Sequence, residues 1–271
     1  MRNISEGEHH KRNVPPVSSD PKTMDTIFVD ASLSGWFKYE TAELIEGFKI
    51  FPEDVVLDVG CGDSPFLYFC AMQGADIIFA DIDAQKVAAM TKILKDSPAR
   101  SVTALVSDAC LLPMKDASVS KIIAMEIMEH VDDTGALLKE LVRVGKPGAQ
   151  YLITVPDPVV ETLQKDLVPP GYFEKPNHVR IIERKEFEQL VMDAGLVVEQ
   201  RRYDGFYWSI WWMFFWACKQ DHRPPWHPLL KSWTQTWKRL LETEQGPMIK
   251  RILDNFMPKS QVIIAKKPNQ S

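Results

Sequence analysis

Glycines and acidic residues stand in this sequence at the ends of short apolar runs. Gly60 and Gly62 follow the run Val55–Val59, and glycine lets a backbone approach a ligand closely and take positive φ values. Asp81 ends a second run, where a carboxylate suits the two ribose hydroxyls of a nucleoside. Asp108 ends a third run, where it could accept a hydrogen bond from the adenine amino group. The pattern predicts a ligand that contains adenosine.

Two kinds of cofactor meet this description, and three details favour S-adenosylmethionine over a dinucleotide. Pro65 and Phe66 occupy the region of the third glycine in the dinucleotide pattern. Asp58 precedes the glycines and could hold the ammonium of a methionine moiety, while Asp108 adds a third acid. An ordinary tight turn with surface aspartates is the alternative without a ligand. The expected cofactor-binding residues are Asp58, Gly60, Cys61, Gly62, Asp81, Ile82, Asp108, Ala109 and Met125.

A second reactive group follows the fourth apolar run, with Glu126, Glu129 and His130 close together in the sequence. If a helical turn begins there, Glu126 shares a face with the other two. Two carboxylates and an imidazole could ligate Mg²⁺ or Mn²⁺, with His178 as a distant fourth ligand. Such an ion would lower the pKa of a bound hydroxyl. Alternatively His130, or after it His178, acts as a catalytic general base, or these residues are purely structural.

The elements that position these residues alternate along the chain. Short β-branched runs separated by helical segments predict a doubly wound α/β fold with a seven-stranded, mostly parallel sheet. Ligands of such sheets bind at the carboxyl ends of the strands. The expected strands are 55–59, 76–80, 102–106, 119–125, 150–155, 196–202 and 261–265, and the expected helices are 34–48, 66–73, 84–95, 134–144 and 185–194.

The segment between the last two expected strands, residues 204–259, is helical in pattern and holds every one of the eight tryptophans except Trp36. Phe206–Cys218 is apolar on all helical faces, which indicates a buried cap helix, a dimer interface or an interfacial membrane anchor. Burial in a cap that lines an apolar or aromatic pocket is favoured. The expected organisation is a flexible arm (1–25), a core (26–203), a cap (204–259) and a final strand with a tail (260–271).

Composition limits the partners and the compartment. A net charge of −5 and a pI near 5.7 argue against nucleic acid as the default partner. The four cysteines are scattered, which indicates neither a disulfide framework nor a zinc cluster and suits a cytoplasmic protein. The N-terminus lacks the apolar stretch of a signal peptide, and Phe206–Cys218 is too short to span a bilayer. The sequence leaves open whether the protein forms a homodimer.

Four segments together resemble the class I S-adenosylmethionine-dependent methyltransferases, and most of all their ubiquinone-pathway O-methyltransferase branch. The resemblance covers roughly residues 35–203 and implies methyl transfer to an oxygen or nitrogen of a small, partly apolar or aromatic metabolite. Some proteins of that branch, and the small-RNA 3′-end methyltransferases, hold a metal at a Glu-x-x-Glu-His arrangement. An RNA 3′-end 2′-O-methyltransferase and a non-catalytic cofactor-binding protein are the alternatives. The segments are Val56–Gly62, Phe79–Asp83, Ser107–Ala109 and Glu126–Val131, and Asn177–Arg180 also fits.

Overall fold

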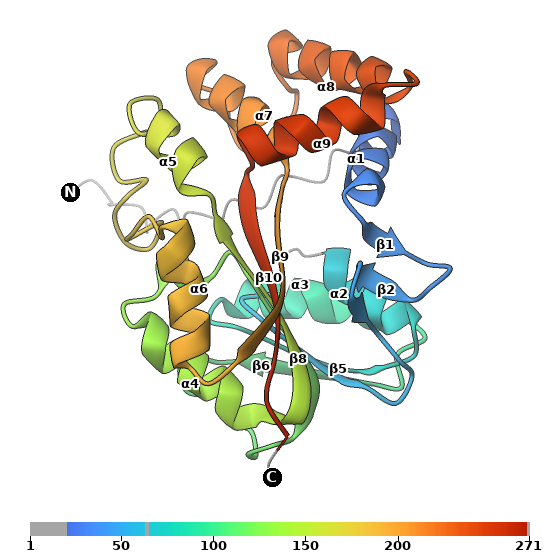
Figure 1. Ribbon diagram of the computed structural model, residues 1–271, viewed down its shortest axis with the longest axis vertical. Helices are drawn as coiled ribbons and strands as arrows, with labels where there is room; N and C mark the ends of the chain where they lie inside the picture. The colour runs from blue at the N-terminus through green and yellow to red at the C-terminus, as the bar shows by residue number, and fades with distance from the viewer. Residues whose placement is uncertain (1–20, 63–64, 270–271) are drawn as a thin grey trace, which may run out of the picture.

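A twisted seven-stranded sheet forms the centre of the molecule (Figure 1). The computed structural model describes residues 21–62 and 65–269. The strand order is β6-β5-β4-β7-β8-β10-β9, and only β10 runs antiparallel to its neighbours. This confirms the expected doubly wound α/β fold. The strands are β4 (Val55–Val59), β5 (Asp76–Asp81), β6 (Ser101–Val106), β7 (Val119–Met125), β8 (Gly145–Pro156), β9 (Val197–Asp204) and β10 (Ser260–Lys266).

Helices cover both faces of this sheet because its strands send alternate apolar side chains to opposite sides. In β4, Val56 packs into one core together with α2 (Pro65–Met72) and α3 (Ala84–Leu94). Leu57 and Val59 pack into the other core, with α4 (Thr134–Val144) and α6 (Arg184–Asp193). A short helix, α5 (Pro158–Gln164), leaves the end of β8.

The expected helix over residues 34–48 is wrong. This segment forms three short antiparallel strands, because residues with positive φ, among them Gly35 at 88° and Gly47 at 90°, interrupt any helix. The helix precedes it instead, as α1 (Pro21–Leu33). Residues 1–20 of the expected arm lie outside the described residues, and residues 21–25 begin α1. The three strands are β1 (Trp36–Lys38), β2 (Glu43–Ile45) and β3 (Phe48–Lys49).

Three helices between β9 and β10 form the expected helical, tryptophan-rich insertion: α7 (Phe206–Ala217), α8 (Pro228–Leu241) and α9 (Gly246–Phe256). They lie together beyond the carboxyl end of β8 (Figure 1). Their aromatic side chains build an apolar core of their own, with Trp211, Phe215 and Trp237 almost fully buried. None of the helices within the described residues has the length and apolar character needed to cross a membrane.

A buried charge network joins this cap to α1. Lys250 of α9 lies 3.0 Å from Asp30 and 2.7 Å from Asp254, and all three side chains are almost fully buried. The Trp237 indole donates to Asp30 over 2.7 Å, and the backbone N–H of Phe206 donates to Asp254 over 2.9 Å. Buried charges are tolerated only when they are paired in this way. The network therefore specifies one position of α1 against the cap.

Candidate active site

Parallel pairing brings the predicted cofactor residues to one edge of the sheet. Val59 pairs with Ala80, and Asp81 pairs with Val106, so β4, β5 and β6 end side by side. β7 is parallel to β4 on its other side. The residues that follow these ends, including Gly60 and Asp108, consequently share the carboxyl edge of the sheet. Such an edge is where α/β sheets bind nucleotides.

The turn after β4 needs its two glycines. Gly60 has a φ of 68° and Gly62 one of 51°, in the left-handed region that favours glycine. The N–H of Gly60 donates to the Ala80 carbonyl over 2.8 Å, and the N–H of Gly62 donates to the Asp81 carboxylate over 3.2 Å. Asp81 is 2% exposed. The loop and the carboxylate are thus held together at the carboxyl edge of the sheet.

The other expected cofactor residues differ in exposure. Asp58 and Cys61 are buried next to this turn, and Ala109 is buried after β6. Ile82 is 69% exposed. Met125 is half-buried at the end of β7.

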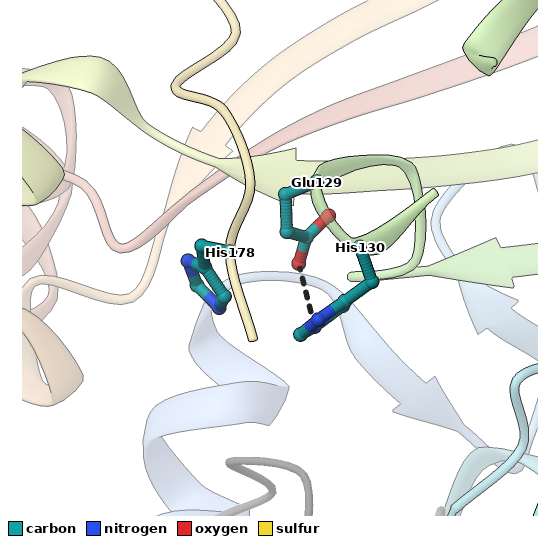
Figure 2. Close-up of side chains that lie close together, drawn as sticks. All are labelled: Glu129, His130 and His178. Carbon is teal, nitrogen blue, oxygen red and sulfur yellow. Dashed lines mark ion pairs between the residues drawn. The ribbon is translucent and has the colours of Figure 1, made fainter. Parts of the chain in front are cut away.

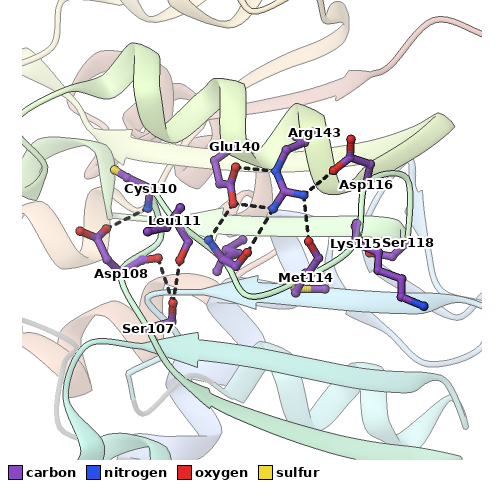
Figure 3. Close-up of polar contacts among 11 residues, drawn as sticks. Ser107, Asp108, Cys110, Leu111, Met114, Lys115, Asp116, Ser118, Glu140 and Arg143 are labelled. Carbon is purple, nitrogen blue, oxygen red and sulfur yellow. Dashed lines mark hydrogen bonds and ion pairs between the residues drawn. The ribbon is translucent and has the colours of Figure 1, made fainter.

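The loop that carries Asp108 is anchored from α4, which the sequence did not indicate (Figure 3). Asp108 accepts a hydrogen bond from the N–H of Cys110 over 2.8 Å. Glu140 accepts the N–H of Leu112 over 2.7 Å, and Arg143 donates to the Met114 carbonyl over 2.8 Å. The hydrogen bond from Arg143 holds the pKa of the Glu140 carboxyl below its usual range. This pair therefore fixes the backbone that presents Asp108.

We expect Arg143→Ala to weaken binding of S-adenosylmethionine about tenfold, roughly 1.4 kcal/mol, because binding must then order the Asp108 loop. Isothermal titration calorimetry measures the effect. Arg100→Ala is the matched control, since Arg100 also pairs with a carboxylate, that of Asp76, but at the opposite edge of the sheet. Equal affinities in the two variants would contradict the expectation.

A cluster of one carboxylate and two imidazoles lies beyond the end of β7 (Figure 2). A 3₁₀ turn, Met128–His130, carries Glu129 and His130, and the loop after α5 brings in His178. One ligand atom from each residue lies within 4.8 Å of the others. The N–H of Val179 donates to the Glu129 carbonyl over 2.8 Å and so ties the two loops together. Three of the four residues expected to bind a metal therefore meet.

The fourth, Glu126, does not join the cluster, because the helical turn begins at Met128 and not at Glu126. Glu126 has a φ of 49°, so the chain turns there before the 3₁₀ segment begins. Its carboxylate lies 3.0 Å from the Lys259 ammonium and accepts the Thr154 hydroxyl over 2.9 Å. Burial alone would lower the pKa of Lys259, but the charges of Glu126 and Glu161 raise it. Lys259 was missed because it lies far away in the sequence.

Two buried glutamates of the site have pKa values shifted in opposite directions. Burial, and next the charge of Glu126, raises the pKa of Glu129 well above its usual range. Neither Glu129 carboxylate oxygen accepts a hydrogen bond from the described residues. Burial would also raise the pKa of Glu161, but its hydrogen bond with His178, 2.8 Å long, holds that pKa below its usual range. Environments that shift the pKa values of two like groups in opposite directions are typical of functional sites.

Hydrogen bonds fix which nitrogen of each imidazole carries the proton. Nδ1 of His130 lies 3.2 Å from the Pro176 carbonyl, which can only accept, so this nitrogen is the donor. Nδ1 of His178 likewise donates to the ionised Glu161. Whenever one of these rings carries a single proton, its lone pair is therefore on Nε2. An ion between these rings and Glu129 would meet two nitrogen donors and one carboxylate.

Known proteins share the core of this chain. A family model described as a methyltransferase domain matches residues 57–153. A probable S-adenosylmethionine-dependent methyltransferase of Mycobacterium tuberculosis is 25% identical over 52% of this chain and 48% of its own length. The 2-methyl-6-phytyl-1,4-hydroquinone methyltransferase of Synechocystis is 30% identical over 60% of this chain and 46% of its own. The chain spans about half the length of the curated relatives it matches.

Solved structures extend the likeness to most of the chain. Geranyl diphosphate methyltransferase in complex with S-adenosylmethionine superposes with a TM-score of 0.52 at 13% identity, over 90% of this chain and 85% of the other. At this identity the likeness concerns the fold, and it agrees with the sheet order. Residues 57–153 therefore carry a methyltransferase domain, and the fold over most of the chain is that of S-adenosylmethionine-dependent methyltransferases.

Proposed function

We propose that this protein transfers a methyl group from S-adenosylmethionine to an oxygen or nitrogen of a small, partly apolar molecule. The observation that carries the proposal is the row of Gly60, Gly62, Asp81 and Asp108 along one sheet edge, with the Glu129 cluster at the next strand end. The glycine turn would accept the methionine part, Asp81 the ribose and Asp108 the adenine. The cofactor supplies a methyl group that is already electrophilic, so the protein chiefly aligns the acceptor with it.

The cap supports an acceptor with apolar surface. Trp216 of α7 packs against Tyr172, whose ring in turn lies 4.7 Å from that of His178. Aromatic side chains thus reach from the cap to the reactive cluster, and ligand pockets are lined mainly by such residues. Two similar proteins are named for acceptors with long apolar parts, a phytyl hydroquinone and geranyl diphosphate.

We also propose that Glu129, His130 and His178 hold a divalent cation. The buried Glu129 carboxylate lacks a hydrogen bond from the described residues, and two imidazole lone pairs belong to the same cluster. With Glu129 ionised and both imidazoles uncharged, the carboxylates of Glu126, Glu129 and Glu161 and the ammonium of Lys259 leave two negative charges, which such an ion would balance. Two nitrogen donors favour Zn²⁺ or Mn²⁺ over the expected Mg²⁺. When bound, the ion would lower the pKa of an acceptor hydroxyl.

The test is incubation of the full chain with methyl-labelled S-adenosylmethionine and cell extracts fractionated by polarity. We expect label in a small, partly apolar product, with transfer that is lost in chelator and restored by Zn²⁺ or Mn²⁺. Mass spectrometry of the product identifies the acceptor atom. Label found only in RNA, or no transfer to any fraction, would contradict the proposed function. Full transfer in chelator would contradict the metal centre alone and leave the histidines as candidates for a general base.

A further inference from the structure

Glu161 reaches the active site because α5 begins in a rigid way. Asp157, fully buried at the end of β8, accepts the N–H of Val159 over 3.1 Å and so caps the helix. Arg184 holds the same carboxylate with two hydrogen bonds of 2.7 and 3.1 Å. Glu161 lies one turn further on, and its N–H donates to the Asp157 carbonyl. Its position is therefore set by the core rather than by the loop that carries His178.

Both carboxylate oxygens of Glu161 are engaged. Oε2 lies 2.8 Å from Nδ1 of His178, and Oε1 accepts the hydroxyl of Tyr172 over 3.2 Å. Glu161 is 2% exposed, His178 4% and Tyr172 6%, so water does not compete for these contacts. The Tyr172 ring contacts both the ring of His178, at 4.7 Å between centroids, and that of Trp216 of the cap, at 5.6 Å. The tyrosine thus cannot turn away without disturbing the cap.

We propose that Glu161, supported by the Tyr172 hydroxyl, is the positioning residue of the active site: it keeps the proton of His178 on Nδ1 and aims Nε2 at Glu129 and His130. The reason is that a buried carboxylate can only accept, so the ring must present its N–H to Glu161. A carboxylate behind a histidine also orients that ring for a metal and increases its basicity. The inference deepens the proposed function, and only its metal measurement rests on the proposed cation.

The test is a long-range ¹H–¹⁵N correlation spectrum of protein labelled at histidine, with His178 assigned from the spectrum of His178→Gln. We expect the Nδ1–H tautomer for His178 in the wild-type protein. In Glu161→Gln the side-chain amide can either accept or donate, so both tautomers should appear. Zn²⁺ affinity, measured by competition with a chromogenic chelator, should fall about 10- to 100-fold. Tyr172→Phe keeps the ring and should shift both readouts in the same direction by less.

Glu140→Gln is the matched control, since Glu140 is also a buried glutamate that accepts a backbone N–H, but it lies on α4 outside the cluster. It should lower the melting temperature and leave the His178 tautomer and Zn²⁺ affinity unchanged. If Glu161→Gln and Tyr172→Phe behave like Glu140→Gln, Glu161 is only structural and the inference is wrong. The tautomer measurement needs neither cation nor cofactor. A wild-type protein that binds no Zn²⁺ would therefore contradict the metal centre without deciding this inference.

Discussion

Asp81→Ala is expected to weaken the binding of S-adenosylmethionine by a factor on the order of 100, about 3 kcal/mol. The carboxylate is buried at the end of β5, where it would accept hydrogen bonds from both ribose hydroxyls. It also accepts the N–H of Gly62, so its removal loosens the glycine turn as well. Isothermal titration calorimetry with S-adenosylhomocysteine measures the loss without turnover.

Asp83→Ala separates this effect from a loss of stability. Asp83 lies two residues away and caps α3, accepting the N–H of Gln85 over 2.8 Å. Loss of such a cap costs about 1 kcal/mol of unfolding free energy but removes no predicted ligand contact. We expect a lower melting temperature with unchanged cofactor affinity. If both variants lost affinity equally, Asp81 would act through the fold and not through the ribose.

Glu129→Gln should stabilise the metal-free protein at pH 8. Burial and the charge of Glu126 raise the pKa of Glu129 in the native protein. At pH values between the usual pKa of a glutamate and this raised pKa, the native state binds more protons than the unfolded state. Stability is therefore lost as the pH rises through this interval. Removing the charge should add about 1–3 kcal/mol at pH 8, and the gain should shrink towards pH 4. Urea unfolding in chelator, followed by tryptophan fluorescence, measures it.

Glu126→Gln should have the opposite effect under the same conditions, because Glu126 is paired with Lys259 across 3.0 Å. Its removal leaves the half-buried Lys259 ammonium without its main partner, which is destabilising. Addition of Zn²⁺ should stabilise the wild-type protein and fail to stabilise Glu129→Gln. A Glu129→Gln protein less stable than wild type at pH 8 in chelator would show that the ion pair with His130, whose Nε2 lies 3.7 Å from Oε1 of Glu129, outweighs the cost of burying this carboxylate.

The placement of the expected cofactor residues at one sheet edge could be predicted from the sequence because it depends on local rules. A few residues are enough to recognise an apolar strand, a glycine that needs positive φ and an acid at the next strand end. Parallel pairing of the strands then brings these residues to one edge of the sheet. The seven strands followed from the same periodicity. The prediction of a helix over residues 34–48 failed because the spacing of the apolar residues there also suits a helix. Phe37 and Ala42 have positive φ values, which neither phenylalanine nor alanine would lead one to expect.

The reactive cluster could be predicted only in part, since its members meet through tertiary contacts. His178 reaches Glu129 because the N–H of the neighbouring Val179 donates a hydrogen bond to the Glu129 carbonyl. Lys259, which lies between α9 and β10, reaches Glu126 through an ion pair. Glu161 belongs to no motif. The only signal for it was the Asp157-Pro158 pair, a typical helix start that would have placed a short helix, and Glu161 on it, after β8.

A crystal structure of the full chain grown with S-adenosylhomocysteine tests the central claim most directly. The account predicts the methionyl end at the turn Gly60–Gly62, the ribose on Asp81 and the adenine beside Asp108, with the sulfur facing the cluster of Glu129, His130 and His178. Ligand density in any other place, or crystals that exclude the ligand at saturating concentration, would contradict it.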